Sequence, residues 1–386
     1  MPAAVQCQAT QTGTTSVTIQ HVFLFMANAL RGRYLLPMLL ALSVMALSSV
    51  TQAAVVKGLY RHEVPIAGQD GTQRAEAMSQ ALSDVLVKVA GQRGVLTNIY
   101  IRNALSKPET YIREFGFRTD DTSTNRQKYF QATFDELAVN QLLEQAGVPI
   151  WGKNRPSTLM WLAIEDRGLR TLVSSADELP RVFGQAFSQR GLPSLFPLMD
   201  FEDEAAISAV DVWGGFSGKI LEASKRYGSQ SILSGRLAED NGRYYGRLNL
   251  TFRGNTQSAA IQGLNSQGVA QTASDLVGSV LSQHYAVNTS DASSKVNLTV
   301  ENVSTLDDYA TLVKYLERVN AVRAVDVENV RGSVISLELT IDGSESQLAD
   351  ALALGRNLEP VSLVSQDVND PLSEITAMTY RWTGRQ

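Results

Sequence analysis

The pattern of apolar and polar residues divides the chain into groups of predicted elements, and the first group lies between residues 54 and 151. Its clearest member is a helix whose apolar stripe recurs at helical spacing up to Gly91. The full set is a strand at 54–66, helices at 71–90 and 98–106, strands at 111–118 and 126–134, and a helix at 135–147. The predicted order is β-α-α-β-β-α, with Phe115 and Phe117 facing Phe130 and Ala132 across the hairpin.

A second group lies between residues 156 and 287. The continuous apolar run at 157–166 predicts a strand buried on both faces. Strands are also predicted at 194–200, 229–240, 243–253 and 256–263, and helices at 176–189, 216–227 and 269–281. Asn241–Gly242 predicts a two-residue hairpin turn, and Pro197 places its strand at an edge. The order β-α-β-α-β-β-β-α indicates a mixed α/β unit.

A third group follows a polar linker at residues 288–295 and occupies residues 296–386. Strands are predicted at 296–300, 321–330, 333–342 and 358–364, with helices at 305–316 and 346–354. Thr305 and Asp308 form a capping-box pattern. The order β-α-β-β-α-β is the ferredoxin-like pattern, and residues 374–382 predict one more strand. The predicted class is therefore α+β, or mixed α/β, in three small units, of which we expect the last to fold on its own.

The most apolar stretch predicts export. Arg31 and Arg33 precede an apolar run from Leu35 to Leu47, which is too short to cross a bilayer. Small residues follow, and cleavage is predicted between Ala53 and Ala54. Residues 26–53 therefore read as a signal peptide that starts at Met26, and residues 1–25 as an over-extended reading frame. The less favoured alternative is a single membrane anchor.

Charge and cysteine content narrow the function classes. The chain has 34 Lys+Arg against 39 Asp+Glu, and removing residues 1–53 takes away 2 arginines, which leaves 32 against 39. This acidic balance argues against a nucleic-acid partner. The only cysteine, Cys7, lies in the predicted extension, so the mature chain would carry neither a disulfide nor a lipid anchor at the cleavage site.

The sequence carries only weak signals of catalytic motifs. His62 and His284 stand apart in the sequence without a neighbouring set of metal ligands. The stretch WGGFSGKIL at 213–221 lacks the first Gly and the Ser or Thr of a phosphate loop, so a plain helix start is favoured. The acidic stretch FEDEAA at 201–206 suits the first turn of a short helix. We therefore predict no catalytic residue, no cofactor and no metal.

One strand carries the candidate partner-binding residues. Alternation along residues 243–253 places Tyr244, Leu248, Leu250 and Phe252 on one face of that strand. The other face carries the candidates, which are Arg243, Tyr245, Arg247 and Arg253. This face is either an anionic-ligand or partner surface, or simply a solvated side of a sheet. Trp151 and Trp161 are a second pair to consider, either stacking a sugar or anchoring the core.

Three segments carry a resemblance to a known family. They are QRAEAMSQALSDVLVKVAGQRG, VPIWGKNRPSTLMWLAIED and ASKRYGSQSILSGRL. Together they resemble domain-of-unknown-function family 2066, a family of uncharacterised secreted Gram-negative proteins, over about residues 55–287. More weakly, the order of elements in the middle unit is similar to the first domain of the Tol-system β-propeller protein and to domains of curli-secretion and penicillin-binding-protein-activator lipoproteins. These resemblances imply an envelope protein that binds other proteins, and they supply no catalytic residues.

The leading functional expectation is a non-enzymatic periplasmic protein that contacts envelope proteins, without a transmembrane span once the signal is removed. Peripheral association with the membrane is compatible with it. The alternatives are a binder of an anionic cell-envelope ligand and an enzyme whose site no motif reveals. A ligand binder should show a deep pocket lined by aromatics and arginines. An enzyme should show a pocket of groups with perturbed pKa, and a partner protein an exposed apolar patch or a sheet edge.

Overall fold

The computed structural model describes residues 54–120, 126–288, 293–355, 357–361 and 378–384. The predicted leader, the cleavage residue Ala53 and the middle of the predicted linker lie outside these ranges. Helices and sheets are mixed along the chain, which confirms the α+β class. The described residues, from 54 onward, belong to one compact unit. Within the described ranges, none of the helices has the length and apolar character needed to cross a membrane.

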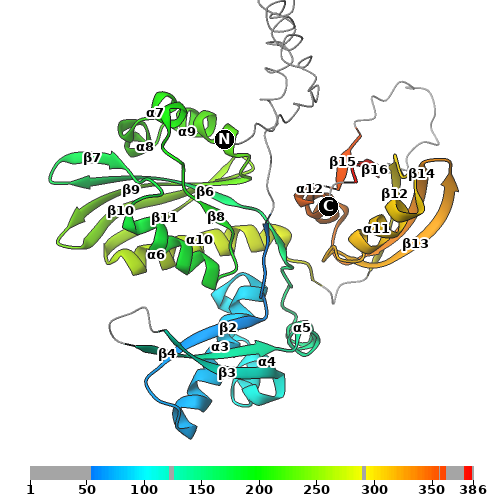
Figure 1. The fold of residues 1–386 in the computed structure, drawn as a ribbon, viewed down its shortest axis with the longest axis horizontal. Coiled ribbons are helices and arrows are strands. Elements are labelled where there is room, and N and C mark those ends of the chain that lie inside the picture. Colours follow the sequence, from blue (N-terminus) through cyan, green and yellow to red (C-terminus); the bar gives the residue numbers. More distant parts are fainter. Residues whose placement is uncertain (1–53, 121–125, 289–292, 356, 362–377, 385–386) are drawn as a thin grey trace, which may run out of the picture. The chain divides into compact units, whose positions relative to one another are not determined.

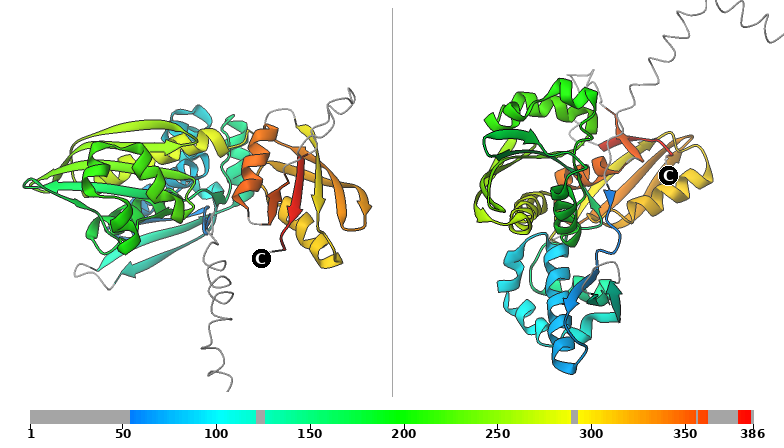
Figure 2. Two further views of the ribbon diagram at one scale, coloured as in Figure 1. Left: turned by 90° about the horizontal axis from the view of Figure 1, so that it is seen from above. Right: turned by 60° about the vertical axis from the view of Figure 1, so that its left-hand side comes forward.

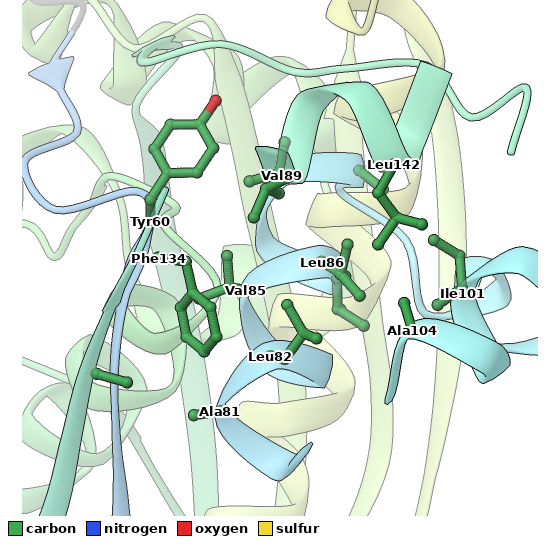
Figure 3. Packing of buried hydrophobic residues seen from close by; sticks show 14 of the residues in the cluster. Tyr60, Ala81, Leu82, Val85, Leu86, Val89, Ile101, Ala104, Phe134 and Leu142 are labelled. Carbon is green, nitrogen blue, oxygen red and sulfur yellow. The ribbon is translucent and has the colours of Figure 1, made fainter. Parts of the chain in front are cut away.

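The first part of this unit is a three-stranded antiparallel sheet packed against helices. Its elements are β2 (Arg61–Ile66), α3 (Gly71–Ala90), α4 (Ile99–Leu105), β3 (Ile112–Asp120), β4 (Gln127–Phe134) and α5 (Glu136–Gln145). The strand order is β2-β4-β3, and Phe117 lies opposite Phe130, as the alternation predicts. Leu82, Val85 and Leu86 of α3 are fully buried between the sheet and the shorter helices (Figure 3).

The middle part is built around one sheet. Its strands are β6 (Thr158–Asp166), β7 (Leu169–Leu172), β8 (Ser194–Leu195), β9 (Ser231–Asp240), β10 (Arg243–Phe252) and β11 (Asn255–Leu264). They follow the order β11-β10-β9-β6-β7, with β8 also paired to β6. β6 runs parallel to β9 and β8, whereas β9, β10 and β11 form an antiparallel meander. The meander places β11 at an edge of the sheet.

Helices cover both sides of β6 but leave part of the sheet open. Figure 1 shows α6 (Glu178–Gln189) and α10 (Ser266–Tyr285) on one side, and α7 (Phe201–Ala206), α8 (Ala209–Gly214) and α9 (Ser217–Ser224) on the other. Met160 and Leu162 face the first layer, and Trp161 faces the second. On the sheet side, the core under α7–α9 is formed by β6, by Ile232 at the start of β9, and by Leu172 of β7 and Leu195 of β8, with no contribution from β10 or β11. The outer sides of β10 and β11 are therefore exposed, and Figure 2 shows the same sheet from two further directions.

Two elements of the middle part differ from the sequence prediction. β7 was not predicted, because it follows a two-residue turn at Arg167–Gly168, which is not among the favoured hairpin pairs. Both turn residues have positive φ, 47° and 81°. The predicted strand at 194–200 is reduced to the two residues of β8. Pro197 lacks the N–H that a longer ladder needs, which explains the early stop.

The last part has the predicted element order and an additional strand inside its sheet. It contains β12 (Ser294–Glu301), α11 (Leu306–Leu316), β13 (Val322–Arg331), β14 (Val334–Ile341), α12 (Glu345–Leu354), β15 (Leu358–Pro360) and β16 (Met378–Trp382). The strand order is β13-β14-β12-β16-β15, with β16 parallel to β12. The final strand thus separates β15 from β12, which departs from the four-stranded ferredoxin-like order. The capping box of Thr305 and Asp308 starts α11, as predicted.

Candidate functional site

The hairpin between β9 and β10 positions the candidate residues. Asn241 and Gly242 form its two-residue turn with φ values of 51° and 74°, as a type I′ turn requires. This turn sets the register, so that Arg243 pairs with Asp240 and Leu248 with Gly235. Tyr244, Leu248, Leu250 and Phe252 are buried against α6 and α10. The intervening side chains must therefore point to the uncovered side of the sheet.

That uncovered side holds a cluster of arginines. Arg243, Tyr245 and Arg247 are exposed there, and Tyr245 has 45% of its surface accessible. The register brings a fourth residue to them, because exposed Arg236 of β9 lies directly opposite Arg247. We call Arg236, Arg243, Tyr245 and Arg247 the basic face. Sequence reasoning missed Arg236, although the two-residue turn alone would have located it by counting along the hairpin.

Within the described ranges the arginines of the basic face form no close ion pair, although Asp240 lies opposite Arg243 in the register. None of the carboxylates that the structure describes lies within 4.0 Å of the guanidinium of Arg236, Arg243 or Arg247. Arg243 instead donates to the carbonyl of Gly263 on β11, at 2.7 Å. Like charges directly opposite each other on neighbouring strands destabilise a sheet. The Arg236–Arg247 pair is thus a local cost for the fold and a source of positive potential.

The fourth predicted candidate, Arg253, has a different role. β10 ends at Phe252, and Arg253 stands in the turn before β11 with a φ of 50°. Its guanidinium pairs with Asp350 of α12, which also lies 2.8 Å from Nε2 of His284. Asp350 is nearly buried, and a buried carboxylate needs cationic partners. Arg253 therefore serves a contact between the middle and last parts of the chain rather than the basic face.

A cleft of about 380 Å³ is the other feature with ionisable groups. It lies between the first part and the α6–α10 layer, and His62, Asp84, Arg93 and Arg190 are among its lining residues. His62 Nε2 contacts Asp84 at 3.2 Å. Arg93 and Arg190 both pair with Asp275, at 2.9 and 3.2 Å. None of the described lining residues is Phe, Tyr or Trp.

The charges of this cleft satisfy one another. Burial raises the pKa of Asp84, but hydrogen bonds from His62 and Gln80 and the nearby positive charge outweigh it, so the pKa lies below its usual value. A carboxylate held in its charged form by such partners is a poor proton acceptor at neutral pH. No group of three or more His, Cys, Asp or Glu in the described part of the chain is placed to hold a metal ion. The ionisable groups named here are thus already paired with one another across the cleft.

Beside the cleft lies a buried cation cluster, made of Lys88, Arg155 and Arg190. Arg155 is fully buried and donates to five backbone carbonyls, including that of Lys88 at 2.8 Å. Arg190 donates to the carbonyls of Val87 and Gly91 at the end of α3, at 3.3 and 3.0 Å. Positive charge at a helix C-terminus is stabilising. The cluster thus joins α3 to the middle part and serves the fold.

The two tryptophans belong to the same structural framework. The guanidinium carbon of Arg155 lies 4.1 Å from the ring centroid of Trp151, which is 1% exposed. Trp161 is fully buried, and its Nε1 donates to the hydroxyl of Ser224 at 2.9 Å. Neither ring is open to a sugar, so the core-anchoring interpretation holds. The two weaker motifs are likewise structural, because 201–206 form α7 and Ser217 begins α9.

Comparison with known proteins adds little about activity. A family model described as a domain of unknown function (DUF8605) matches residues 53–152. It is a different family from the one that the sequence resembles, and that resemblance stays a prediction. No curated protein matches the chain. Two crystal structures of S. aureus homoserine dehydrogenase, at pH 7.0 and 8.5, each match with 12% identity and a TM-score of 0.13, and the match covers 46% of this chain and 50% of theirs.

A third crystal structure of the same dehydrogenase, at pH 7.5, matches with 11% identity and the same TM-score. The chain spans about half the length of these solved structures. A TM-score of 0.13 carries no information about a shared fold or activity.

Proposed function

We propose that this protein is an exported, non-enzymatic envelope protein that binds an acidic partner protein through the basic face. The observation that carries the proposal is the register that places Arg236 opposite Arg247 on a sheet side left open by α7–α9. An unneutralised pair of like charges costs stability. A partner with carboxylates on its surface would remove that cost on binding, which gives the face a physical reason to bind.

The residue types support a protein partner. Arginine and tyrosine are enriched where proteins bind one another, because they combine a large contact area with directed hydrogen bonds. Tyr245 stands between Arg243 and Arg247 and is half-exposed. The cleft offers a weaker alternative, because its arginines already pair with Asp275. The predicted signal peptide at residues 26–53 supplies the expected compartment, the periplasm.

The test compares two triple variants of equal charge. The first is R236S/R243S/R247S on the basic face. The control is R74S/R102S/R113S, which removes three exposed arginines of the first part that lie more than 4.0 Å from every described carboxylate. Each protein is expressed with its own leader in a Gram-negative host, cross-linked in intact cells and purified by a tag. Circular dichroism establishes that each variant is folded.

We expect the cross-linked partner to be lost from the basic-face variant and kept by the control, and its binding to weaken as salt is raised. Equal recovery from both variants would refute the proposal. Recovery of an anionic glycan or wall fragment in place of a protein would instead establish the ligand-binding alternative. Turnover of such a fragment by the purified protein would overturn the non-enzymatic assignment.

A further inference from the structure

The edge strand β11 differs from the other sheet edges of the described chain. The ten residues NTQSAAIQGL contain no Lys, Arg, Asp, Glu or Pro. Exposed edges are normally protected by charge, by proline, by bulges or by being short. β3 and β13 carry several charges, β2 contains Pro65, and β7 and β15 have four and three residues. β11 has none of these protections along most of its length.

The hairpin geometry shows which backbone groups of β11 are free to pair. Phe252 and Asn255 flank the two-residue turn at Arg253–Gly254, so they form a hydrogen-bonded pair. Every second residue from Asn255 then bonds to β10. Thr256, Ser258, Ala260 and Gln262 alternate with these, and their N–H and C=O groups point away from the sheet. All four residues are exposed. The register is unbroken from Asn255 to Gln262, and the irregularity comes only after it, between Tyr244 and Tyr245 of β10.

The basic face lies directly beside this edge. Arg247 is opposite Ala260, and Tyr245 is opposite Gln262. A strand added to β11 would lie about 10 Å from β10, two strand spacings away. Ala260 carries only a methyl group, so no long side chain of β11 separates Arg247 from the position of the added strand. An acidic side chain at the level of Ala260 would therefore meet the positive charge of Arg247.

From these observations we infer that β11 accepts an extended acidic segment of a partner protein as an additional strand of the sheet. The backbone of the segment pairs with Thr256, Ser258, Ala260 and Gln262. Its carboxylates alternate onto the side of the basic face, and its other side chains lie beside Ala259 and Ile261 on the side that α10 covers. The inference rests on the proposed function and gives it a binding mode and a class of ligand.

The probe is a peptide that alternates Glu and Val over about ten residues, the length of β11. A Lys–Val peptide controls for charge, and a Glu–Val peptide N-methylated at alternate residues controls for backbone pairing. Binding to the mature protein is measured by calorimetry, and amide exchange is measured by NMR. We expect the Glu–Val peptide alone to bind and to slow exchange at residues 256, 258, 260 and 262. Binding of the N-methylated peptide with equal affinity would overturn strand addition.

A pair of variants tests the same edge from the protein side. Ala260→Pro removes an outward N–H, at a position where an edge strand tolerates proline, and Ala260→Thr keeps it. We expect about a tenfold loss of peptide affinity for A260P and little change for A260T. If A260P does not fold, the comparison of the Glu–Val, Lys–Val and N-methylated peptides decides between the outcomes.

The outcomes separate this inference from the proposed function. Peptide binding that needs the arginines but leaves β11 exchange unchanged would remove strand addition and keep the basic face. If peptide binding neither needs the arginines nor slows exchange in β11, both the strand-addition inference and the proposed function are overturned. Self-association of the protein that A260P abolishes would show that β11 pairs with a second copy of itself, which would also overturn the inference.

Discussion

Arg236 on β9 and Arg247 on β10 lie directly opposite each other on the open side of the middle sheet. The pair has no described carboxylate within ion-pair distance, so the two charges repel one another across the ladder. This single relationship connects the stability of the sheet to the proposed function. Removing one of the two charges is expected to stabilise the sheet and to weaken partner binding.

Replacing one arginine of this pair should stabilise the protein. We expect Arg236→Thr to raise the free energy of unfolding by about 0.2–1 kcal/mol, because threonine is a good strand residue and the repulsion is lost. The gain should shrink as salt rises from about 0.01 M to 1 M. Urea denaturation at both ionic strengths measures it, with Arg113→Thr on β3 as the control. A destabilised R236T protein, or a gain that is insensitive to salt, would contradict the prediction.

The buried Arg155 should not tolerate even a conservative change. Lysine has three donors on a flexible stem and cannot reproduce the planar set of five bonds to backbone carbonyls. We expect Arg155→Lys to lower the free energy of unfolding by about 2–4 kcal/mol, because buried carbonyls lose their donors. The control is Arg170→Lys, since Arg170 also lies over a tryptophan, 4.5 Å from the centroid of Trp213, but is partly exposed.

Arg170→Lys should cost less than about 1 kcal/mol, because exposed ion pairs contribute little. Thermal and chemical denaturation of both variants supply the comparison. If Arg155→Lys and Arg170→Lys lower the free energy of unfolding by similar amounts, the burial of Arg155 and its bonds to backbone carbonyls do not make it more important for stability than Arg170.

Lys88 should make stability depend on pH above neutrality. Burial, together with the charge of Arg155, lowers the pKa of Lys88 to about 8, from 10.5 in the unfolded chain. Between these values the unfolded state binds more protons than the folded state, so stability from this group rises with pH. Well below pH 8 the lysine is protonated in both states and its full burial cost is present. Relative to Lys88→Met, the wild type should gain up to about 3 kcal/mol between pH 7 and 10.5.

Denaturation of the wild type and K88M across this range isolates the effect, because other titrating groups cancel in the difference. The methionine variant also loses the hydrogen bond from Lys88 to the carbonyl of Arg61, but that loss does not vary with pH. A constant difference between the two proteins would mean that Lys88 titrates normally.

The mature N-terminus is the prediction that rests on sequence alone. We expect Ala54, or a residue within about two positions of it, to be the first residue of the exported protein. Ala54 and Val55 form the short strand β1, which pairs with β5 (Asn154–Arg155), so cleavage at this site leaves that pairing intact. N-terminal sequencing of envelope-fraction protein gives the answer, and retention of Met1 or Met26 would rule the site out. Deleting residues 1–25 should leave export unchanged.

Local patterns in the sequence determined most of the helices and strands, and they also determined the residues that β10 contributes to the basic face. The stripe of α3, the double-sided burial of β6 and the inward set of β10 follow from apolar spacing, because each depends on residues a few positions apart. The Asn241–Gly242 turn also determined the register that pairs Arg236 with Arg247, since both strands leave the same short turn.

Only the tertiary structure decided which surfaces remain open and which charges are buried. Arg155 bonds to the carbonyl of Lys88, 67 residues away, and Arg253 pairs with Asp350, 97 residues away. The parallel pairing of β6 with β9 leaves β11 at an edge, and β16 enters the last sheet between β12 and β15. These contacts join residues that are distant in the chain, and their formation depends on packing and loop closure rather than on local periodicity.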